Sequence, residues 1–423
     1  MRIGIVSDTH LGFGMDSERE EDSFRNCREA LEKVSDTDVV IMPGDIFDTK
    51  IPSQEVLSRT IKLFRTLKDG SEVEFEGKVW KDGRKPVVAI HGTHERRGRD
   101  SVNPVELLDD AGFLVHLHNE KVTVRKDGER VNIFGMSGVP ERYAPKVLKR
   151  WDPEPEEGYN ILMFHQSVEG FVYTDSETDV LKLSDMPEGF DLLIDGHIHW
   201  RNLELRGKDV PLIFPGSTIA TQLNKKEMET RKGVVIIDTE KDELSFRPLE
   251  GTRKVHRLEV DVTGMGENEI VDLVVKEVED ILEEHEKDPL VRVAVTGETE
   301  SSIRSSEIRR RIEGCILKIG DKTSSPENDS EQVEMGEDDV EEVGVSILSD
   351  QLGFEGFEDV FSSLADGDVE EVLEMFREMD REDLEEFLEQ AEEGENRDEK
   401  SGKDCESDPE KEKTGGNSLL DYV

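Results

Sequence analysis

Short apolar runs rich in β-branched residues recur along the first 240 residues, and most of them stop at a glycine, an aspartate or a histidine. Runs of this length and composition predict buried strands. They are Ile3–Ser7, Val39–Met42, Val87–Ile90, Val131–Phe134, Ile161–Phe164, Leu192–Ile194, Leu212–Phe214 and Val234–Ile237. Helical patterns separate the early runs, and strands dominate later. This order predicts an α/β fold in which two mixed sheets form a sandwich flanked by helices over residues 1–250.

Three helix starts are predicted by capping residues. Ser17 and Ser53 are expected N-caps, and Asn103 with Pro104 forms an expected cap and first helical residue. A polar, glycine-bearing stretch over residues 68–86 is expected to be a surface hairpin insertion.

After Gly251 the pattern restarts and predicts a small α/β domain over residues 251–320. Strands are expected around Arg257–Val262, Val291–Val295 and Cys315–Ile319, with helices around Asn268–Glu286 and Ser305–Ile312. We expect this segment to be a domain of its own.

The rest of the chain has a different composition, because residues 321–423 carry 37 of the 101 acidic side chains but 8 of the 54 basic ones. Residues 321–350 are predicted to be a disordered acidic linker and residues 394–423 a disordered acidic tail. Between them, residues 351–393 are expected to contain two amphipathic helices. Their apolar stripes include Val372, Phe376, Phe387 and Leu388.

The net charge of -47 would normally argue against a nucleic-acid partner, which is bound through Lys and Arg. However, the acid excess and the aromatic share of 6% also suit a halophilic host. In about 1 M salt the Debye length is ~3 Å, so distant carboxylates would hardly repel DNA. The charge therefore leaves the substrate open.

Two further patterns bear on location and redox chemistry. The N-terminal strand lacks a signal-peptide pattern and no apolar run reaches the ~18 residues of a membrane span, so a cytoplasmic protein without a membrane partner is expected. Cys27, Cys315 and Cys405 are odd in number and far apart, which predicts neither a disulfide framework nor a thiolate metal site.

The candidate chemistry lies in five motifs that follow predicted strands, where α/β folds place active sites. They are Asp8-Thr9-His10, Gly44-Asp45-Ile46-Phe47-Asp48, Gly92-Thr93-His94-Glu95, His165-Gln166 and Gly196-His197-Ile198-His199. Each motif alone is weak evidence for a metal site, because such patterns occur by chance in many proteins. Five of them in this order, each after a predicted strand, are strong evidence. Two divalent ions about 3.5–4 Å apart require carboxylates, imidazoles and one bridging carboxylate, for which Asp45 is the natural candidate. His91 is expected to be structural.

These motifs, together with Pro-Gly-Ser-Thr at 215–218, resemble the calcineurin-like metallophosphoesterases. Within them the chain resembles the double-strand-break repair nucleases of the meiotic recombination eleven or SbcD family, of a halophilic archaeal type. The resemblance covers about residues 1–320. It implies two Mn²⁺ ions, one held by Asp8, His10, Asp45 and His199 and the other by Asp45, Thr93, His165 and His197. It also implies that His94 is catalytic without being a ligand, facing the scissile phosphate.

Two positions depart from the family pattern. Thr93 stands where the family usually has Asn, and a hydroxyl is the weaker neutral ligand, so the second metal is expected to bind less tightly. Asp48 stands where the family often has a second histidine, which exchanges a possible phosphate contact for an acidic hydrogen-bonding group.

The resemblance further implies that residues 251–320 form a DNA-binding capping domain over the active-site face, and it implies partners. DNA ends and single strands would be cut by 3′-to-5′ exonuclease and endonuclease activities, with phosphate contacts expected from Arg96, Arg97, Arg99, Lys225 and Lys226, and also from Arg231 and Lys232. An ABC-type ATPase of the Rad-fifty or SbcC type would dock on residues 367–393, and the chain would form a homodimer. Two alternatives stay open: a small-substrate phosphodiesterase or phosphatase, and a largely structural DNA-end tether.

Overall fold

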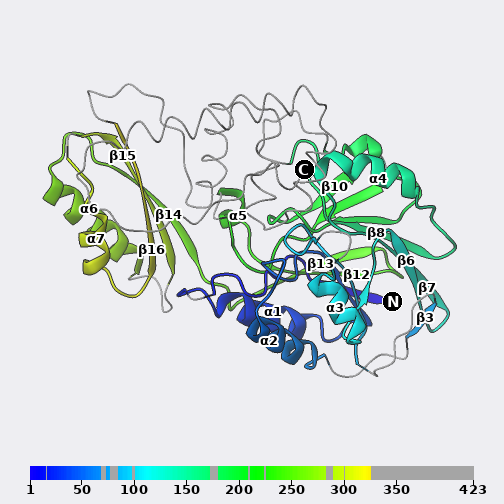
Figure 1. Cartoon of the computed structure of the whole chain (residues 1–423). Helices are drawn as coiled ribbons and strands as arrows, with labels where there is room; N and C mark the ends of the chain where they lie inside the picture. Colours follow the sequence, from blue (N-terminus) through cyan, green and yellow to red (C-terminus); the bar gives the residue numbers. More distant parts are fainter. Residues whose placement is uncertain are drawn as a thin grey trace, which may run out of the picture. The chain divides into compact units, whose positions relative to one another are not determined.

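The parts of the chain described by the computed structural model form three β-sheets with helices around them (Figure 1). The described residues are 1–15, 17–67, 73–76, 84–97, 101–171, 180–207, 210–222, 225–282, 289–299 and 301–324. The predictions for residues 325–423, including the helical docking region with Val372, Phe376, Phe387 and Leu388, lie outside these residues.

The first sheet has six strands, and four of them run parallel to one another. Its order is β13 (Glu243–Pro248), β12 (Gly233–Asp238), β1 (Arg2–Ile5), β2 (Val39–Pro43), β4 (Val87–Ile90) and β5 (Val115–His116). The parallel pairs are β1 with β2, β2 with β4 and β4 with β5. The carboxyl ends of β1, β2 and β4 therefore share one edge of the sheet.

The second sheet has seven strands with a parallel centre. Its order is β10 (Asn202–Gly207), β11 (Val210–Phe214), β9 (Leu192–Asp195), β8 (Tyr159–Phe164), β7 (Glu129–Met136), β6 (Glu120–Lys126) and β3 (Glu74–Glu76). Strands β7, β8, β9 and β11 are parallel neighbours. Strand β3 lies within the predicted insertion over residues 68–86, of which residues 73–76 and 84–86 are described, and it pairs antiparallel with β6.

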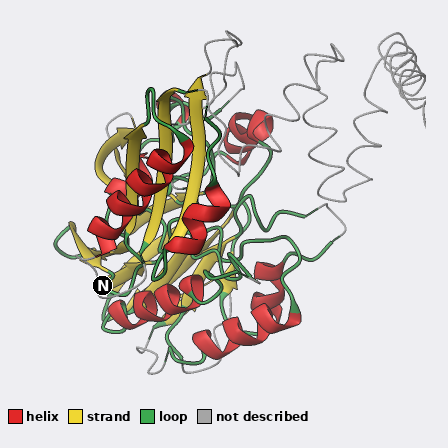
Figure 2. Ribbon diagram, turned by 90° about the vertical axis from the view of Figure 1, so that its left-hand side faces the viewer, coloured by secondary structure: helices red, strands yellow, loops and turns green. Residues whose placement is uncertain are grey.

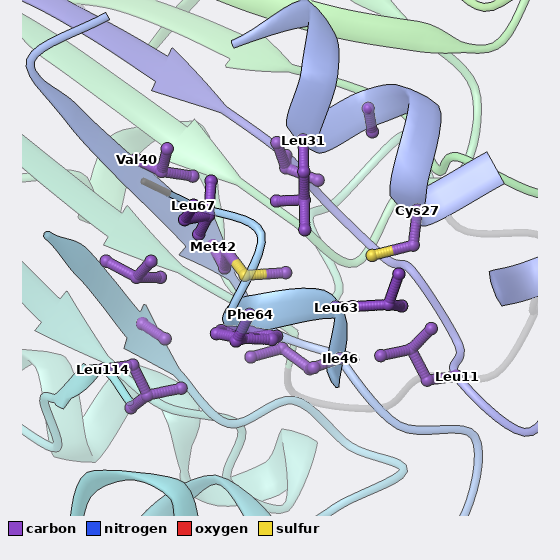
Figure 3. Close-up of a cluster of buried hydrophobic side chains, with 14 of the residues drawn as sticks. Leu11, Cys27, Leu31, Val40, Met42, Ile46, Leu63, Phe64, Leu67 and Leu114 are labelled. Carbon is purple, nitrogen blue, oxygen red and sulfur yellow. The ribbon is translucent and has the colours of Figure 1, made fainter. Parts of the chain in front are cut away.

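Successive side chains of the central strands enter different cores, which explains their unbroken apolar sequence. In β2, Val39 and Ile41 face the second sheet, whereas Val40 and Met42 face the helices α1 (Asp22–Lys33) and α2 (Gln54–Phe64). Figure 3 shows Val40 and Met42 in that outer core beside Leu31 and Leu63.

Helices lie on both outer faces of the sandwich (Figure 1), and Figure 2 colours helices red and strands yellow. Together with α1 and α2, α3 (Pro104–Asp110) contributes to the core on the first sheet, and α4 (Ala144–Trp151) packs on the second. The predicted α/β sandwich flanked by helices is thus confirmed.

The predicted helix caps are correct at two of three positions. Ser53 accepts a hydrogen bond from the Val56 amide, and Asn103 caps α3 with Pro104 in its first turn. The prediction for Ser17 is wrong, because α1 begins at Asp22. The Ser17 hydroxyl instead accepts from the Arg19 amide and donates to the Gly14 carbonyl, so it stabilises a turn that precedes the helix.

The third sheet consists of the parallel strands β14 (Val255–Asp261), β15 (Leu290–Glu298) and β16 (Ile316–Ser324). Helices α6 (Glu267–Leu282) and α7 (Ser305–Arg311) share a separate core with this sheet. No helix among the described residues is long and apolar enough to cross a membrane.

Candidate active site

The five motifs meet where strands from both large sheets end. Asp8 and His10 follow β1, Asp45 follows β2, and Thr93 and His94 follow β4. From the second sheet, His165 follows β8, and His197 and His199 follow β9. Ligand atoms of Asp8, His10, Asp45 and His199 all lie within 4.8 Å of one another, and all four residues are buried. Tertiary structure therefore brings residues nearly 200 positions apart into one cluster.

The backbone at this cluster is strained. Asp8, His10 and Asp45 have φ values of 48°, 41° and 44°, in the left-handed region that side chains rarely adopt. Such a conformation costs roughly 1–2 kcal/mol per residue. Hydrogen bonds hold it, because the His10 amide donates to the Asp45 carbonyl at 3.0 Å and the Leu11 amide donates to the Ile46 carbonyl at 2.8 Å. Strain of this kind concentrates at functional sites.

Two glycines permit the close approach of these loops. A Cβ on Gly44, whose φ is +97°, would lie 2.3 Å from His165 Nδ1. A Cβ on Gly196 would lie 1.8 Å from the Pro43 carbonyl oxygen. The glycines in the Gly-Asp and Gly-His motifs are therefore required so that the two sheets can bring their ligands together.

The first group of ligand atoms has the composition of a cation site. His10 Nε2 lies 3.2 Å from His199 Nε2 and 4.0 Å from Asp45 Oδ2, and His199 Nε2 lies 3.9 Å from Asp8 Oδ1. Asp8 Oδ1 is fully buried and has no hydrogen-bond partner among the described residues. A buried carboxylate oxygen without a partner is costly unless a cation faces it, so these residues fit a divalent metal.

A second group shares Asp45 with the first. Asp45 Oδ2 lies 3.0 Å from His165 Nε2, and His165 Nε2 lies 3.4 Å from His197 Nδ1. One carboxylate oxygen thus faces nitrogens of both groups, which is the position that a bridging ligand between two ions requires. The half-buried Thr93 lies in the turn between Gly92 and His94, next to this second group in sequence.

Hydrogen bonds behind the histidines select the nitrogen that each one presents. His165 Nδ1 lies 2.9 Å from the Pro43 carbonyl and must donate to it, which leaves Nε2 as the nitrogen that could bind a cation. His10 Nδ1 lies 3.1 Å from Asp48 Oδ1, which likewise leaves Nε2. His197 differs, because its Nε2 lies 3.2 Å from the Ser167 hydroxyl and its Nδ1 faces the cluster. Such outer contacts orient metal ligands and set their basicity.

Charges in the site are strongly coupled. Burial lowers the pKa of His165, but Asp45, Asp8 and the Pro43 carbonyl together outweigh this and raise the pKa to about 10. Conversely, burial raises the pKa of Asp45, but the surrounding histidines, His165 first among them, together hold the pKa well below its usual range. Burial and the charge of His165 lower the pKa of His197 to about 3. At neutral pH the metal-free site therefore keeps its proton on His165.

This arrangement predicts proton release when metal binds. Near pH 7 the His165 proton must leave before Nε2 can bind a cation, and burial also raises the pKa of Asp8, so metal binding should release protons and the metal affinity should rise with pH. Titration calorimetry in buffers of different ionisation enthalpy measures the release. Binding that is independent of both buffer and pH would contradict it.

His94 lies at the open side of the cluster. Its ring is exposed and stands edge-on to His10, with 4.8 Å between ring centroids. The Nδ1 atom lies 2.9 Å from the Asp48 carbonyl, to which it donates, so Nε2 remains available. His10, Asp48 and His94 also form a second, more open group of possible metal ligands. Asp48 thus contacts both histidines, one through its carboxylate and one through its backbone.

Glu95 is a structural residue that sequence reasoning missed. Its fully buried carboxylate accepts from the Phe47 amide at 2.6 Å and from the Gly92 amide at 2.8 Å, which joins the Asp45 and His94 loops. Burial, together with the nearby Asp45, raises the pKa of Glu95 to about 8. Its position directly after His94 was the only sequence signal.

His91 turns away from the ligand cluster. Its Nδ1 lies 3.0 Å from His116 Nε2, and its ring stacks on His118 with 5.3 Å between centroids.

The expected phosphate-binding residues differ in their exposure to solvent. Arg96 is half-buried, Arg97 is exposed and donates to the Val102 carbonyl, and Arg99 lies outside the described residues. On α5 (Lys225–Glu229), Lys225 and Lys226 are exposed, and Lys226 Nζ lies 4.8 Å from the centre of the Trp200 ring. The expectation for Lys232 is wrong, because its ammonium group is buried and pairs with Glu227.

Comparison with known families agrees with this geometry. Residues 1–201, which contain every candidate ligand, match the calcineurin-like phosphoesterase family. Residues 1–201 thus form a calcineurin-like phosphoesterase domain. Members of this family are metal-dependent hydrolases of phosphate esters, and the buried carboxylate and imidazole groups of this chain suit that chemistry.

The chain is also similar to a set of repair proteins, which confirms the family resemblance inferred from the motifs. It is 27% identical to the DNA double-strand break repair protein Mre11 of Methanopyrus kandleri, over 77% of this chain and 74% of the relative. The protein of the same name from Thermoplasma acidophilum is 29% identical over 69% and 76%. The human double-strand break repair protein MRE11 is 24% identical, and the match covers 60% of this chain and 41% of the human protein.

Thr93 offers a direct test of the second group of ligands. If its hydroxyl binds the second ion, Thr93→Asn should tighten that ion or raise activity at limiting metal, because an amide oxygen is the stronger neutral ligand. Thr93→Ala should weaken the same ion. Manganese titration of the three proteins decides the point, and three identical titrations would show that Thr93 is not a ligand.

Proposed function

We propose that this phosphoesterase is a manganese-dependent DNA nuclease that cuts duplex ends as a 3′-to-5′ exonuclease and single strands as an endonuclease, in the repair of double-strand breaks. The observation that carries the proposal is the pair of ligand groups sharing Asp45, with the exposed His94 beside them. The similarity to repair proteins named Mre11 supports DNA as the substrate.

The proposed ligands divide into two sets. Asp8, His10, Asp45 and His199 would hold one Mn²⁺, and Asp45, Thr93, His165 and His197 would hold the other. Two such ions supply a nucleophilic water at neutral pH and neutralise charge on the phosphate. His94 would act from the open side, where its Nε2 can give a proton to the leaving oxygen while Nδ1 stays bound to the Asp48 carbonyl.

DNA would reach the site along basic side chains. Arg96 and Arg97 follow His94 in the chain, and Lys225 and Lys226 lie on α5. We propose that they contact phosphates, and that the domain over residues 251–320 contributes to the DNA-binding surface. Phosphate contacts of this kind position the nucleic acid without reading its sequence.

Two other functions share the same metal site. A small-substrate phosphodiesterase would need neither the cations nor the third sheet, and a structural DNA-end tether would bind DNA without cutting it.

One assay distinguishes the nuclease from these two alternatives. The purified protein is incubated in high salt with Mn²⁺ or Mg²⁺. The substrates are end-labelled duplex DNA, single-stranded DNA and a generic phosphodiester. Hydrolysis of the generic ester alone would exclude the nuclease, and DNA binding without cleavage would favour the tether.

We also propose a partner ATPase of the ABC type, of the Rad-fifty or SbcC kind, docked through Val372, Phe376, Phe387 and Leu388. The support is the amphipathic pattern of residues 367–393, since a helix binds a groove through a few apolar anchors.

The docking proposal predicts the behaviour of a shortened protein. Deleting residues 351–423 should abolish co-purification with the ATPase but leave metal-dependent cutting of single-stranded DNA largely intact. Co-expression followed by pull-down and a nuclease assay measures both properties. Full-strength pull-down by the shortened protein would place the docking surface elsewhere.

A homodimer is the remaining partner prediction. Ile51, Val102 and Leu107 are 73%, 52% and 45% exposed, and all three lie beside or on α2 and α3. Exposed apolar side chains of this size are candidates for a subunit interface. Light scattering on the parent and on Leu107→Glu would test this.

A further inference from the structure

The metal ligand candidate His199 is held at two points, its ring and its backbone. His199 Nδ1 lies 2.9 Å from the Thr221 hydroxyl, while Nε2 faces His10 and Asp8. The His199 carbonyl accepts from Lys232 Nζ at 3.1 Å and from the Ser217 amide at 3.1 Å. Neither Thr221 nor Lys232 belongs to a motif that ligates metal, yet both contact this histidine.

Buried Glu227, on α5, joins these two contacts. Its Oε1 accepts from the Thr221 amide at 3.1 Å and from Lys232 Nζ at 2.9 Å, and it lies 3.5 Å from His199 Nδ1. Its Oε2 accepts from the Gln222 amide at 2.9 Å. The carboxylate thereby fixes the loop that carries the Thr221 hydroxyl and also the ammonium group that holds the His199 backbone.

Burying this ion pair costs desolvation free energy, which other interactions must offset. Glu227 and Lys232 are both buried, and desolvation of two charges can exceed the gain from their attraction. Each charge here is compensated by several hydrogen bonds, and Lys232 Nζ also donates to the Ser217 hydroxyl at 2.6 Å. All of these bonds converge on the loop around one metal ligand, so the pair organises the site as well as the fold.

We propose that Thr221 and Glu227 are positioning residues for His199: the Thr221 hydroxyl accepts the His199 Nδ1 proton, and Glu227 holds Thr221 in place. This contact keeps His199 in the tautomer whose Nε2 lone pair faces the ligand group. The inference rests on the proposed metal site but not on DNA as the substrate. Outer contacts of this kind typically change metal affinity by about 10–100-fold.

Replacing Thr221 with valine tests the role of the hydroxyl group alone. Thr221→Val keeps the shape of the side chain but cannot accept the proton, whereas Thr221→Ser keeps the hydroxyl. Thr221→Val should weaken one of the two Mn²⁺ ions by about 10-fold or more, while Thr221→Ser should stay close to the parent. Thr230→Val is the matched control, since the Thr230 hydroxyl donates to the Lys226 carbonyl at the far end of α5.

Two measurements on the full chain decide the matter. Calorimetry with Mn²⁺ gives the affinity and number of ions. Nitrogen-15 NMR of histidine side chains in the metal-free protein gives the tautomer, with the His199 signals assigned by their loss in His199→Asn. The parent should show the Nδ1-protonated form of His199, and Thr221→Val should lose it.

The outcomes separate this inference from the proposed function. A parent protein that binds no metal would overturn the metal site itself. A parent that binds two ions, with Thr221→Val identical to it in affinity and tautomer, would overturn the positioning role alone. Glu227→Gln is a second variant, expected to weaken the same ion; if it does not fold, the Thr221 variants still decide.

Discussion

Changing His94 to serine should lower the rate of DNA cleavage by roughly 10²-fold or more while two metal ions remain bound, because general acid catalysis contributes about that much. His94 is exposed at the open side of the ligand cluster, and its Nδ1 is held by the Asp48 carbonyl. Serine removes the proton-transferring nitrogen and leaves the buried ligands untouched.

A matched variant strengthens the test of His94. His118 is also exposed but stacks on His91, away from the ligand cluster, so His118→Ser should cut DNA at the parent rate. Elemental analysis of all three proteins gives the metal content. Loss of metal from His94→Ser would mean that His94 is a ligand, in line with the open group that it forms with His10 and Asp48.

The substitution Asp45→Asn should have the larger effect, because one oxygen of Asp45 faces both ligand groups. It lies 3.0 Å from His165 Nε2 and 4.0 Å from His10 Nε2. We expect loss of at least one ion and a fall in activity of roughly 10³-fold, which corresponds to the several kcal/mol that metal ions contribute to such reactions. Asparagine also tolerates the left-handed backbone at this position.

The same variant has a readout that does not depend on activity. Asp45 contributes most to the raised pKa of His165, with smaller contributions from Asp8 and the Pro43 carbonyl, so the pKa of His165 should fall in Asp45→Asn. In the parent, the stability that the His165–Asp45 ion pair contributes is lost as the pH rises through the raised pKa of His165. Asp45→Asn should remove this contribution. Asp110→Asn, at the exposed end of α3, is the control. Two bound ions and an unchanged His165 titration would exclude Asp45 as the bridge.

Most of the fold was predictable because its strands are buried on both faces. A strand such as β2 must be apolar at every position, which makes it visible as a run even without alternation. Ser53 and Asn103 were predictable for a similarly local reason, since a cap bonds amides within three residues of itself. Ser17 shows the limit, because the same side chain serves a turn equally well.

The residues that could form the site were predictable from the sequence, because each motif follows a strand and parallel strands deliver their carboxyl ends to one edge. The charges and orientations of those residues depend on the tertiary structure. The proton on His165, the nitrogen that His197 turns toward the cluster and the burial of Lys232 depend on Asp45, Ser167 and Glu227, which lie far away in the chain or carry no motif. Hydrogen bonds and electrostatic interactions act over a few ångströms in space, whatever the separation along the chain, so no local pattern could reveal these partners.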